Sequence, residues 1–553
     1  MRDLLRKGGL LVKLPTSLVN SPRGLLGGSY IAKTACQASF LSGTESEGEH
    51  VPLSAEQYCR DLETSPQPGI GKILVTGATG YVGGRLVPEL LARGYDVRVM
   101  VRAFSLECEE RWPGAEVVTG DALDLDSLIA ALKGVHTAYY LIHSLLHGPR
   151  RFERLEITAA SNFRKAADRN KVSRVVYLGG LGDRTSRLSD HLRTRQAIAN
   201  ELGQGSAALT ILRAAIILGS GSASFEMIEH LVRSLPVLFL PPWAETKCQP
   251  IAIRNVVMYL VGVLETPETA GSSYDIGGPD VLSYHEMLKI FSEILGLKRL
   301  FIPLFFSDIR TYSYITSLVT PVPHPIVFSL LESTANMVVC ENNDITNVVR
   351  LNLLSYREAV IRALSREDQD RIYTRWSDAY PPAHELALKL TEMERDALYT
   401  KATSVSTRKS AAALFSSICR VGGKKGWFNL NWLWKIRGML DRVLTGVGTA
   451  RGRRSSSFLR IGDVVDFWRV EDISPDQRVL LRAEMKLPGR AWMEFSINAN
   501  LDGTRQLTLK TYYQPFGFWG KAYWYACLPL HFFIFSDLIR QIERRSSTEG
   551  MSP

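Results

Sequence analysis

The chain has 553 residues, of which 45% are hydrophobic and 22% charged, and its formal net charge is +10. This is the balance of a globular protein with room for two or three domains. The basic residues are dispersed among acidic ones, and the tight cluster of Arg451, Arg453 and Arg454 lacks interleaved aromatic side chains, which argues against specific nucleic-acid binding.

The seven cysteines are scattered along the chain and include no Cys-x-x-Cys pair. Their odd number and wide spacing argue against a disulfide framework and against a structural zinc site. We therefore expect no bound metal and a reducing compartment.

Residues 1–70 differ from the rest of the chain. Residues 1–44 hold six basic residues and one acidic residue among Leu, Ser and Gly, a composition typical of a mitochondrial targeting segment. The alternative is a disordered extension of a cytoplasmic protein. Residues 45–70, with three prolines, read as a linker.

Residues 72–76 form a short apolar run that leads into a glycine loop. The loop reads Thr76-Gly77-Ala78-Thr79-Gly80-Tyr81-Val82-Gly83. Its three glycines allow the backbone to turn sharply and to approach a pyrophosphate, which the amides at the start of the next helix then face. The helix is predicted to run to about residue 93, with a kink at Pro88 and a stop at Gly94.

A second strand, predicted at residues 97–102, ends at Arg102. An acid at this position would hydrogen-bond the ribose of NAD, whereas an arginine suits the 2′-phosphate of NADP. Asp96 lies at the wrong end of the strand for the first role. NADP is favoured over NAD, and the alternative is that Arg102 stacks on adenine or caps the strand.

The alternation of strands and helices continues. Gly120 and Asp121 follow a third strand, where a carboxylate can meet the adenine edge. Further strands are predicted at residues 135–142, 174–178 and 209–212, and helices at 152–170 and 194–202. This pattern predicts an α/β Rossmann fold with a doubly wound parallel sheet.

These motifs resemble a known family. The run ILVTGATGYVGGRL, the pair Gly120-Asp121, LGGLGD at 178–183 and SYHE after IGGPD resemble the atypical, NmrA-like branch of the extended short-chain dehydrogenase/reductases. The nucleotide-binding accessory subunit of respiratory complex I belongs to the same broad group. The resemblance covers residues 71–365 and implies a nicotinamide cofactor and a substrate lobe after the sixth strand.

Active members of this superfamily use Tyr-x-x-x-Lys with a nearby Ser. The matching positions here hold His191 and Arg195, and the Ser position holds Gly179 or Gly180. One interpretation is that His191 is a substitute proton donor and Arg195 holds the nicotinamide ribose or a phosphate. The other is that both support the fold or the cofactor without chemistry.

Other side chains are also expected near the nicotinamide site. Tyr139 and Tyr140 lie on the fourth strand, where most aromatic residues pack rather than react. Ser222, Ser224 and Glu226 are candidates for lining the substrate pocket. The apolar residues 231–242 fit either an apolar substrate or a core.

The C-terminal part has a different pattern of apolar and polar residues. Apolar and polar residues alternate through 479–487, 491–497 and 507–513, with turns at Pro488-Gly489 and Asp502-Gly503, which predicts an antiparallel meander covered by a helix at 518–545. Residues 401–545 resemble a domain of unknown function that follows such reductase domains in bacteria and looks like the helix-grip fold of polyketide-cyclase and lipid-transfer proteins. Residues 366–400 read as a linker.

Seven of the ten tryptophans lie in this part of the chain. They are expected to form the walls of a ligand pocket, a solid core or a contact with another subunit. The uncharged stretch 522–536 is too short for a membrane span and contains Pro529, so we expect at most a peripheral membrane contact. A hydrophobic small molecule and a protein are the expected partners.

Together the motifs predict an NADP-dependent oxidoreductase acting on a hydrophobic carbonyl or quinone-like molecule. The alternative is a non-catalytic nucleotide-binding protein with an assembly, accessory or redox-sensing role.

Overall fold

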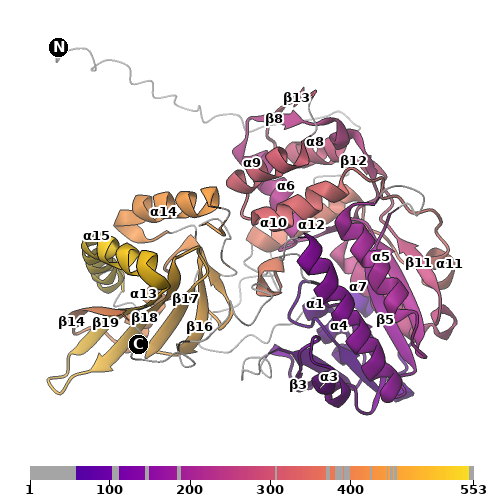
Figure 1. Cartoon of the computed structure of the whole chain (residues 1–553), viewed down its shortest axis with the longest axis horizontal. Coiled ribbons are helices and arrows are strands. Elements are labelled where there is room, and N and C mark those ends of the chain that lie inside the picture. The colour runs from indigo at the N-terminus through magenta and orange to yellow at the C-terminus, as the bar shows by residue number, and fades with distance from the viewer. Residues whose placement is uncertain are drawn as a thin grey trace, which may run out of the picture. The chain divides into compact units, whose positions relative to one another are not determined.

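A computed structural model describes residues 58–102, 111–143, 149–182, 188–305, 308–368, 374–379, 390, 399–423, 426–444, 446–448, 453 and 458–546 (Figure 1). The expected targeting segment and most of the expected linker 366–400 lie outside the described residues. The same holds for Cys36, Cys108, Asp183, Arg451 and Arg454.

The first domain is built on a parallel sheet of seven strands in the order β11-β6-β5-β4-β1-β2-β3. The strands are β1 Lys72–Val75, β2 Val97–Val101, β3 Glu116–Thr119, β4 Val135–Tyr140, β5 Arg174–Gly180, β6 Ala208–Ala214 and β11 Ser273–Ile276. The order of the first six strands is that of dinucleotide-binding doubly wound sheets, so the predicted fold class is confirmed. β11 was not predicted, because Ser-Tyr-Asp-Ile is not a continuous apolar run.

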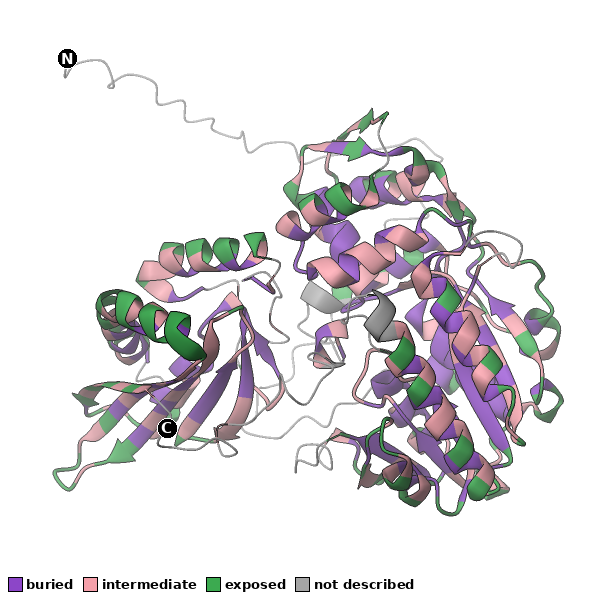
Figure 2. Ribbon diagram, in the orientation of Figure 1, coloured by how far each residue is buried: buried purple, intermediate pink, exposed green. Residues whose placement is uncertain are grey.

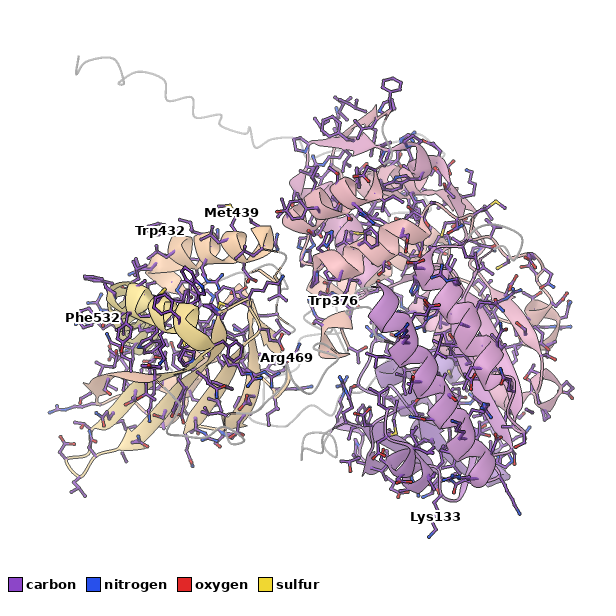
Figure 3. The ribbon with its side chains drawn as sticks, viewed as in Figure 1. Lys133, Trp376, Trp432, Met439, Arg469 and Phe532 are labelled. Atoms are coloured by element: carbon purple, nitrogen blue, oxygen red, sulfur yellow. The ribbon has the colours of Figure 1, made fainter. Side chains whose placement is uncertain are left out.

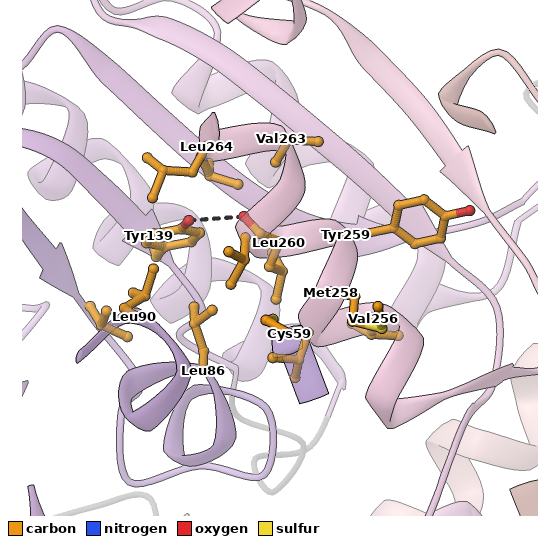
Figure 4. Close-up of a cluster of buried hydrophobic side chains, with 14 of the residues drawn as sticks. Cys59, Leu86, Leu90, Tyr139, Val256, Met258, Tyr259, Leu260, Val263 and Leu264 are labelled. Carbon is orange, nitrogen blue, oxygen red and sulfur yellow. Dashed lines mark hydrogen bonds between the residues drawn. The ribbon is translucent and has the colours of Figure 1, made fainter. Parts of the chain in front are cut away.

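Helices cover both faces of this sheet. They are α1 Gly83–Ala92, α3 Leu125–Ala131, α4 Pro149–Arg169, α5 Asp190–Leu202 and α7 Ile253–Glu265. Successive strand residues point to opposite faces, so Ile73 and Val75 pack with α1 and α7, whereas Leu74 packs with α3, α4 and α5. Figure 2 shows the strands of this sheet buried along most of their length, and Figure 4 shows the cluster on the α1 and α7 face.

α1 continues through Pro88 and ends at Ala92, and Gly94 follows at φ +81°. The helix therefore ends where the glycine stop was predicted.

Short strand pairs and helices form the lobe that follows β6. The strands are β7 Ile217–Leu218 with β10 Ile251–Ala252, β8 Val237–Leu240 with β13 Leu300–Pro303, and β9 Lys247–Cys248 with β12 Leu282–Ser283. The helices are α6 Ala223–Ser234, α8 Tyr284–Ile294, α9 Ile309–Val319, α10 His324–Ser333, α11 Ile345–Val348 and α12 Tyr356–Asp368. Leu231, Val232, Leu238 and Leu240 are buried among these helices, so these four apolar residues of 231–242 serve as core.

The C-terminal domain is an antiparallel sheet of six strands in the order β14-β19-β18-β17-β16-β15. The strands are β14 Tyr399–Thr407, β15 Val464–Val465, β16 Trp468–Ser474, β17 Arg478–Ala483, β18 Gly489–Ala499 and β19 Arg505–Pro515. The helices are α13 Ala411–Ile418, α14 Asn431–Val443 and α15 Gly517–Arg545. The predicted meander of β17, β18 and β19 is confirmed, with Phe495 opposite both Val479 and Leu509.

α15 corrects one expectation. The uncharged stretch judged too short to span a membrane is part of a helix of 29 residues that continues through Pro529. By length and composition alone, α15 is the single helix in the described ranges that could cross a membrane.

Most of the aromatic residues in this domain form a solid core. The rings of Trp427 and Trp434 stack with centroids 4.2 Å apart, and Phe467 lies 5.8 Å from Trp434. Five of the seven tryptophans are buried, namely Trp427, Trp434, Trp468, Trp492 and Trp524. Trp432 and Trp519 remain 57% and 76% exposed.

Candidate functional site

The glycine loop, residues 76–83, follows β1 at the carboxyl edge of the parallel sheet. Thr76 fixes it to the end of β4, because its backbone amide and its hydroxyl both donate to the carbonyl of Tyr139, at 3.0 and 2.8 Å. The same hydroxyl accepts from the amide of Leu141 at 3.3 Å. Thr76 therefore holds the loop in place through its side chain and is fully buried.

Two glycines of the loop have no room for a side chain. Gly77 has φ +66°, and a Cβ there would lie 2.5 Å from the carbonyl oxygen of Leu141. A Cβ on Gly83 would lie 2.4 Å from the carbonyl oxygen of Gly77. The loop therefore folds tightly over itself before α1, whose N-cap Val82 supplies no side-chain hydrogen bond.

The middle of the loop is partly open. Gly80 donates its amide to the carbonyl of Gly77 at 3.0 Å, and Thr79, Tyr81 and Val82 are half-buried. The Arg85 guanidinium carbon lies 4.3 Å from the centroid of the Tyr81 ring. Burial raises the pKa of the Tyr81 hydroxyl, so this group stays neutral.

Arg102 and Asp121 lie at the same edge of the sheet as the loop. Their strands, β2 and β3, are neighbours, and the amide of Gly120 donates to the carbonyl of Val101 at 2.9 Å. Both side chains are exposed, and the Asp121 carboxylate accepts from the amide of Leu123 at 2.9 Å. Asp96 lies at the other edge, 3.4 Å from Lys72.

His191 and Arg195 lie on the first turns of α5, which Ser189 caps. Arg195 is buried and forms an ion pair with Glu156 of α4, with 2.5 Å between Nη2 and Oε2. The same Nη2 donates to Nδ1 of His143 at 2.6 Å. The same Nδ1 also lies 3.4 Å from Oε1 of Glu156, so His143 contacts both partners of the ion pair.

The two histidines of this cluster are neighbours, with ring centroids 5.2 Å apart. Burial, and then the nearby His143 and Arg195, hold the pKa of His191 well below its usual range. His191 is therefore neutral at physiological pH. We call His143, Glu156, His191 and Arg195 the histidine–arginine cluster.

Gly180, one of the two glycines expected at the position of the serine, lies at the end of β5. A Cβ there would lie 3.0 Å from Leu192 Cδ2 and 3.4 Å from Arg195 Cγ. The absence of a side chain on Gly180 thus lets α5 pack directly on the end of β5. Sequence spacing pointed to His191 and Arg195 but not to Glu156, which lies on the buried face of α4 with Ala159, Ala160 and Phe163.

Tyr139 and Tyr140 are core residues on opposite faces of the sheet. The Tyr139 hydroxyl donates to the carbonyl of Leu260 at 2.9 Å (Figure 4). The Tyr140 ring packs against Phe163 with centroids 4.9 Å apart. Burial raises the pKa of both hydroxyls, so the packing interpretation holds for both tyrosines.

Residues 374–379, which we call the strap, lie against the glycine loop. The Thr374 hydroxyl donates to the carbonyl of Tyr81 at 2.8 Å, and Arg85 donates to the carbonyl of Thr374 at 3.0 Å. A Cβ on Gly84 would lie 2.5 Å from Thr374 Cγ2, and one on Gly221 would lie 2.5 Å from the carbonyl oxygen of Thr374. Both glycines therefore leave space for the strap.

The strap also holds Glu226, one of the residues expected near the substrate. Trp376 Nε1 donates to one carboxylate oxygen at 2.7 Å and Arg375 to the other at 3.1 Å (Trp376 is labelled in Figure 3). Burial raises the pKa of Glu226, and the Arg375 guanidinium opposes that rise. Ser222 caps α6 by accepting from the amide of Phe225 at 3.1 Å, and Ser224 is half-buried.

The five cysteines that the structure describes are free. Within the described part of the chain, no group of three or more His, Cys, Asp or Glu side chains is placed to hold a metal ion.

Residues 70–338 match the NmrA-like family, and residues 393–538 match a family described as a protein of unknown function (DUF2867). A ceramide reductase from Caulobacter vibrioides is 26% identical over 233 residues, which cover 41% of this chain and 72% of that protein. NADH dehydrogenase [ubiquinone] 1 alpha subcomplex subunit 9, mitochondrial, from Arabidopsis thaliana is 24% identical over 342 residues, or 56% of this chain and 82% of that protein. A solved structure of the Citrobacter sp. triphenylmethane reductase complexed with NADP(H) is 21% identical, covers 53% of this chain and 99% of that one, and has a TM-score of 0.44.

Proposed function

We propose that the domain at residues 70–338, which matches the NmrA-like family, binds a nicotinamide dinucleotide with its pyrophosphate on the glycine loop. The proposal rests on the tight turn of the loop at Gly77 and Gly83. A Cβ would lie 2.5 Å from a backbone oxygen at Gly77 and 2.4 Å from one at Gly83. Such a bare turn brings the amides at the start of α1 to the ligand, and the helix dipole adds to the attraction of the phosphates.

NADP is the cofactor that the residues around the ribose end favour. Arg102 stands at the end of β2, the position from which an arginine meets a 2′-phosphate. Asp121 is already used by the amide of Leu123, and Asp96 faces Lys72 at the opposite edge. Thr79, Gly80, Tyr81, Val82 and Gly120 complete the set of residues that we propose to surround the cofactor.

The chemistry that we propose is reduction of a hydrophobic carbonyl or quinone-like substrate, for which the bound reduced nicotinamide supplies a hydride. His191 is neutral, so it donates a hydrogen bond to the oxygen that gains charge, and the proton that this oxygen takes up after hydride transfer comes from solvent. Arg195 is a positioning residue, because its guanidinium is occupied by Glu156 and His143. The similarity to a ceramide reductase supports an apolar substrate.

Direct binding of NADPH and NADH tests the cofactor proposal. We expect Gly77→Val to weaken NADPH binding by at least about a hundredfold, because the turn must open to admit the side chain. Arg102→Ala should weaken NADPH binding by about tenfold and leave NADH binding unchanged. Arg98→Ala is the matched control, since Arg98 lies on the same strand and pairs with Glu116. Equal affinity for NADPH in the wild type and in all three variants contradicts the proposal.

Turnover tests the enzymatic part. NADPH oxidation with a panel of aldehydes and quinones should fall by about a hundredfold in His191→Phe, with NADPH affinity retained.

The ion pair between Arg195 and Glu156 supports a second function. Glu156 engages the cation that stands at the position of the catalytic lysine of active relatives. In this alternative the domain binds the nucleotide without turnover, as part of an assembly or as a redox sensor. The similarity to a complex I subunit supports it. Tight NADPH binding with no oxidation on any substrate of the panel, and no effect of His191→Phe, favours this function over the first.

A mitochondrial location is proposed from the composition of residues 1–44 and from the similarity to the mitochondrial Arabidopsis subunit. The location of a fluorescent protein fused to the C-terminal end of residues 1–70 tests this proposal. Uniform cytoplasmic fluorescence would contradict it.

A further inference from the structure

α14 turns its apolar side outward. Its exposed residues follow helical spacing and are apolar apart from one lysine: Trp432, Lys435, Ile436, Met439, Leu440, Val443 and, directly after the helix, Leu444. Its buried residues are Trp434, Gly438 and Asp441. Figure 2 shows this outward face exposed, and Figure 3 shows Trp432 and Met439 pointing away from the sheet.

The buried side of α14 is fixed in place by Asp441. This carboxylate accepts from the amide of Gly448 at 2.8 Å and from the amide of Lys486 at 2.7 Å. Trp434 adds the stacked contact with Trp427. The outward direction of the apolar stripe is therefore set by the packing of the domain, since a rotation of α14 would leave Asp441 buried without these donors.

The first two-thirds of α15 show the same inversion. Its exposed large side chains are Phe518, Trp519, Tyr525, Leu530, Phe532 and Phe533, and Phe516 precedes the helix. Residues 517–536 contain Lys521 as their single charged residue. The last part of the helix is ordinary, because it buries Leu538, Ile539 and Ile542 and exposes Arg540, Arg544 and Arg545.

The two helices are neighbours. The rings of Trp434 and Phe535 have centroids 6.4 Å apart, and the Arg545 guanidinium carbon lies 4.5 Å from the centroid of the Phe428 ring, just before α14. We call the outward residues of α14 and of 516–533 the aromatic surface. A soluble monomer rarely exposes so many large apolar side chains on two neighbouring helices unless they meet a partner.

Cations border this surface. Lys401 Nζ lies 5.2 Å from the centroid of the Phe532 ring, and the Arg490 guanidinium carbon lies 5.3 Å from that of Phe516. Lys435 and Lys521 are exposed on the two helices themselves. A second copy of the chain would bring these like charges face to face, whereas an anionic lipid surface complements them.

We propose that the aromatic surface docks the protein on the surface of an anionic lipid bilayer. Trp, Tyr and Phe side chains enter the interfacial region while the bordering lysines and arginines meet lipid phosphates. Surface docking fits better than a spanning α15, because Trp524 stacks on Tyr513 of the sheet with centroids 5.4 Å apart and an interplanar angle of 6°. Crossing the membrane would pull this buried face away from the domain. The proposal does not depend on the function proposed above.

Flotation of the full-length protein with vesicles of phosphatidylcholine, with and without phosphatidylglycerol, tests the proposal. We expect binding to the vesicles that contain phosphatidylglycerol, and weaker binding at high salt. Phe532→Ser with Phe533→Ser should weaken the affinity by about a hundredfold, or about tenfold for each ring. Lys521→Gln should weaken it by about fivefold.

Leu501→Ser is the matched control. Leu501 is fully exposed in the turn between β18 and β19, so the variant removes a similar apolar side chain away from the aromatic surface and should bind as the wild type does. Because all these side chains are exposed, the variants should also unfold as the wild type does.

Three results would overturn the proposal. The first is a wild type that does not float, or helix variants that bind no worse than Leu501→Ser. The second is a wild-type dimer in sedimentation that the Phe532 and Phe533 changes dissociate, without vesicle binding, since a second copy then covers the surface. The third is a membrane-bound protein that resists extraction at alkaline pH, which would make α15 a spanning helix.

Discussion

Two helices of thirteen residues use their faces in opposite ways. In the first domain, α5 buries Leu192, Ile198 and Leu202 and exposes Arg193. In the C-terminal domain, α14 buries Gly438 and exposes a row of large apolar residues. Each domain nevertheless has a well-packed core of its own.

The two helices differ because the apolar side of each one packs against a different kind of partner. The apolar side of α5 is completed by α4 and the end of β5, so the polar residue that it buries, Arg195, must be paired within the domain. The apolar side of α14 stays exposed within its own domain, and the partner that we propose for it is the anionic lipid surface. Mutations on the inward side of either helix should therefore act on stability, and mutations on the outward side of α14 on binding.

The largest effect is expected for Arg195→Met. This change leaves the Glu156 carboxylate buried without its cation, which should lower the free energy of unfolding of the first domain by about 3–5 kcal/mol. Hydrogen exchange of α4 and α5 in increasing urea assigns the loss to this domain.

Glu156→Gln in the Arg195→Met background is the control, since it removes the unpaired charge and should restore much of the stability. An unchanged free energy of unfolding in Arg195→Met would mean that no buried ion pair is present. The contrast between α5 and α14 would then rest on their apolar residues alone.

Local sequence signals were sufficient for six of the seven strands of the central sheet. The six predicted strands are short, mostly apolar runs, and β1, β2 and β4 pair in the parallel order that the glycine loop implies. β14 was missed because its residues alternate between half-buried and exposed without a strong apolar face. Such a strand is defined by its partner β19 rather than by its own composition.

The candidate site was only partly predictable. The spacing of His191 and Arg195 is local to one helix, whereas Glu156 and His143 come to them only through the order of the strands. A charged residue on the otherwise apolar face of α4 was the signal that could have identified Glu156. The strap had no such signal, because its contacts with Tyr81 and Glu226 join residues far apart in the sequence.

The next effect concerns pH and the inner side of α15. Burial, and then the nearby Lys401, lower the pKa of His531 to about 4, whereas an unfolded histidine has a pKa of about 6.5. Between these values the unfolded chain binds a proton that the folded domain does not, so stability is complete above pH 6.5 and falls as the pH drops toward 4. The full loss is about 3 kcal/mol.

His531→Phe should flatten this dependence. Urea unfolding of the C-terminal domain, followed by hydrogen exchange of α15 at several pH values, measures the slope. An equally steep loss in the variant would assign the acid sensitivity to other groups.

The smallest effect on stability is expected on the outward side of α14. Trp432→Gln and Ile436→Gln should change the free energy of unfolding in vesicle-free solution by less than about 0.5 kcal/mol, because both side chains are already in water. Trp434→Ala, two residues along the same helix from Trp432, removes a stacked ring and should cost about 3–5 kcal/mol.

Vesicles containing phosphatidylglycerol sharpen this contrast. They should stabilise the wild type, since they bind only the folded surface, and should stabilise Trp432→Gln much less. A large loss of stability in Trp432→Gln without vesicles would show that this ring is already covered in solution. The outward stripe of α14 would then be part of a protein interface, and α5 and α14 would differ only in which protein surface covers their apolar side.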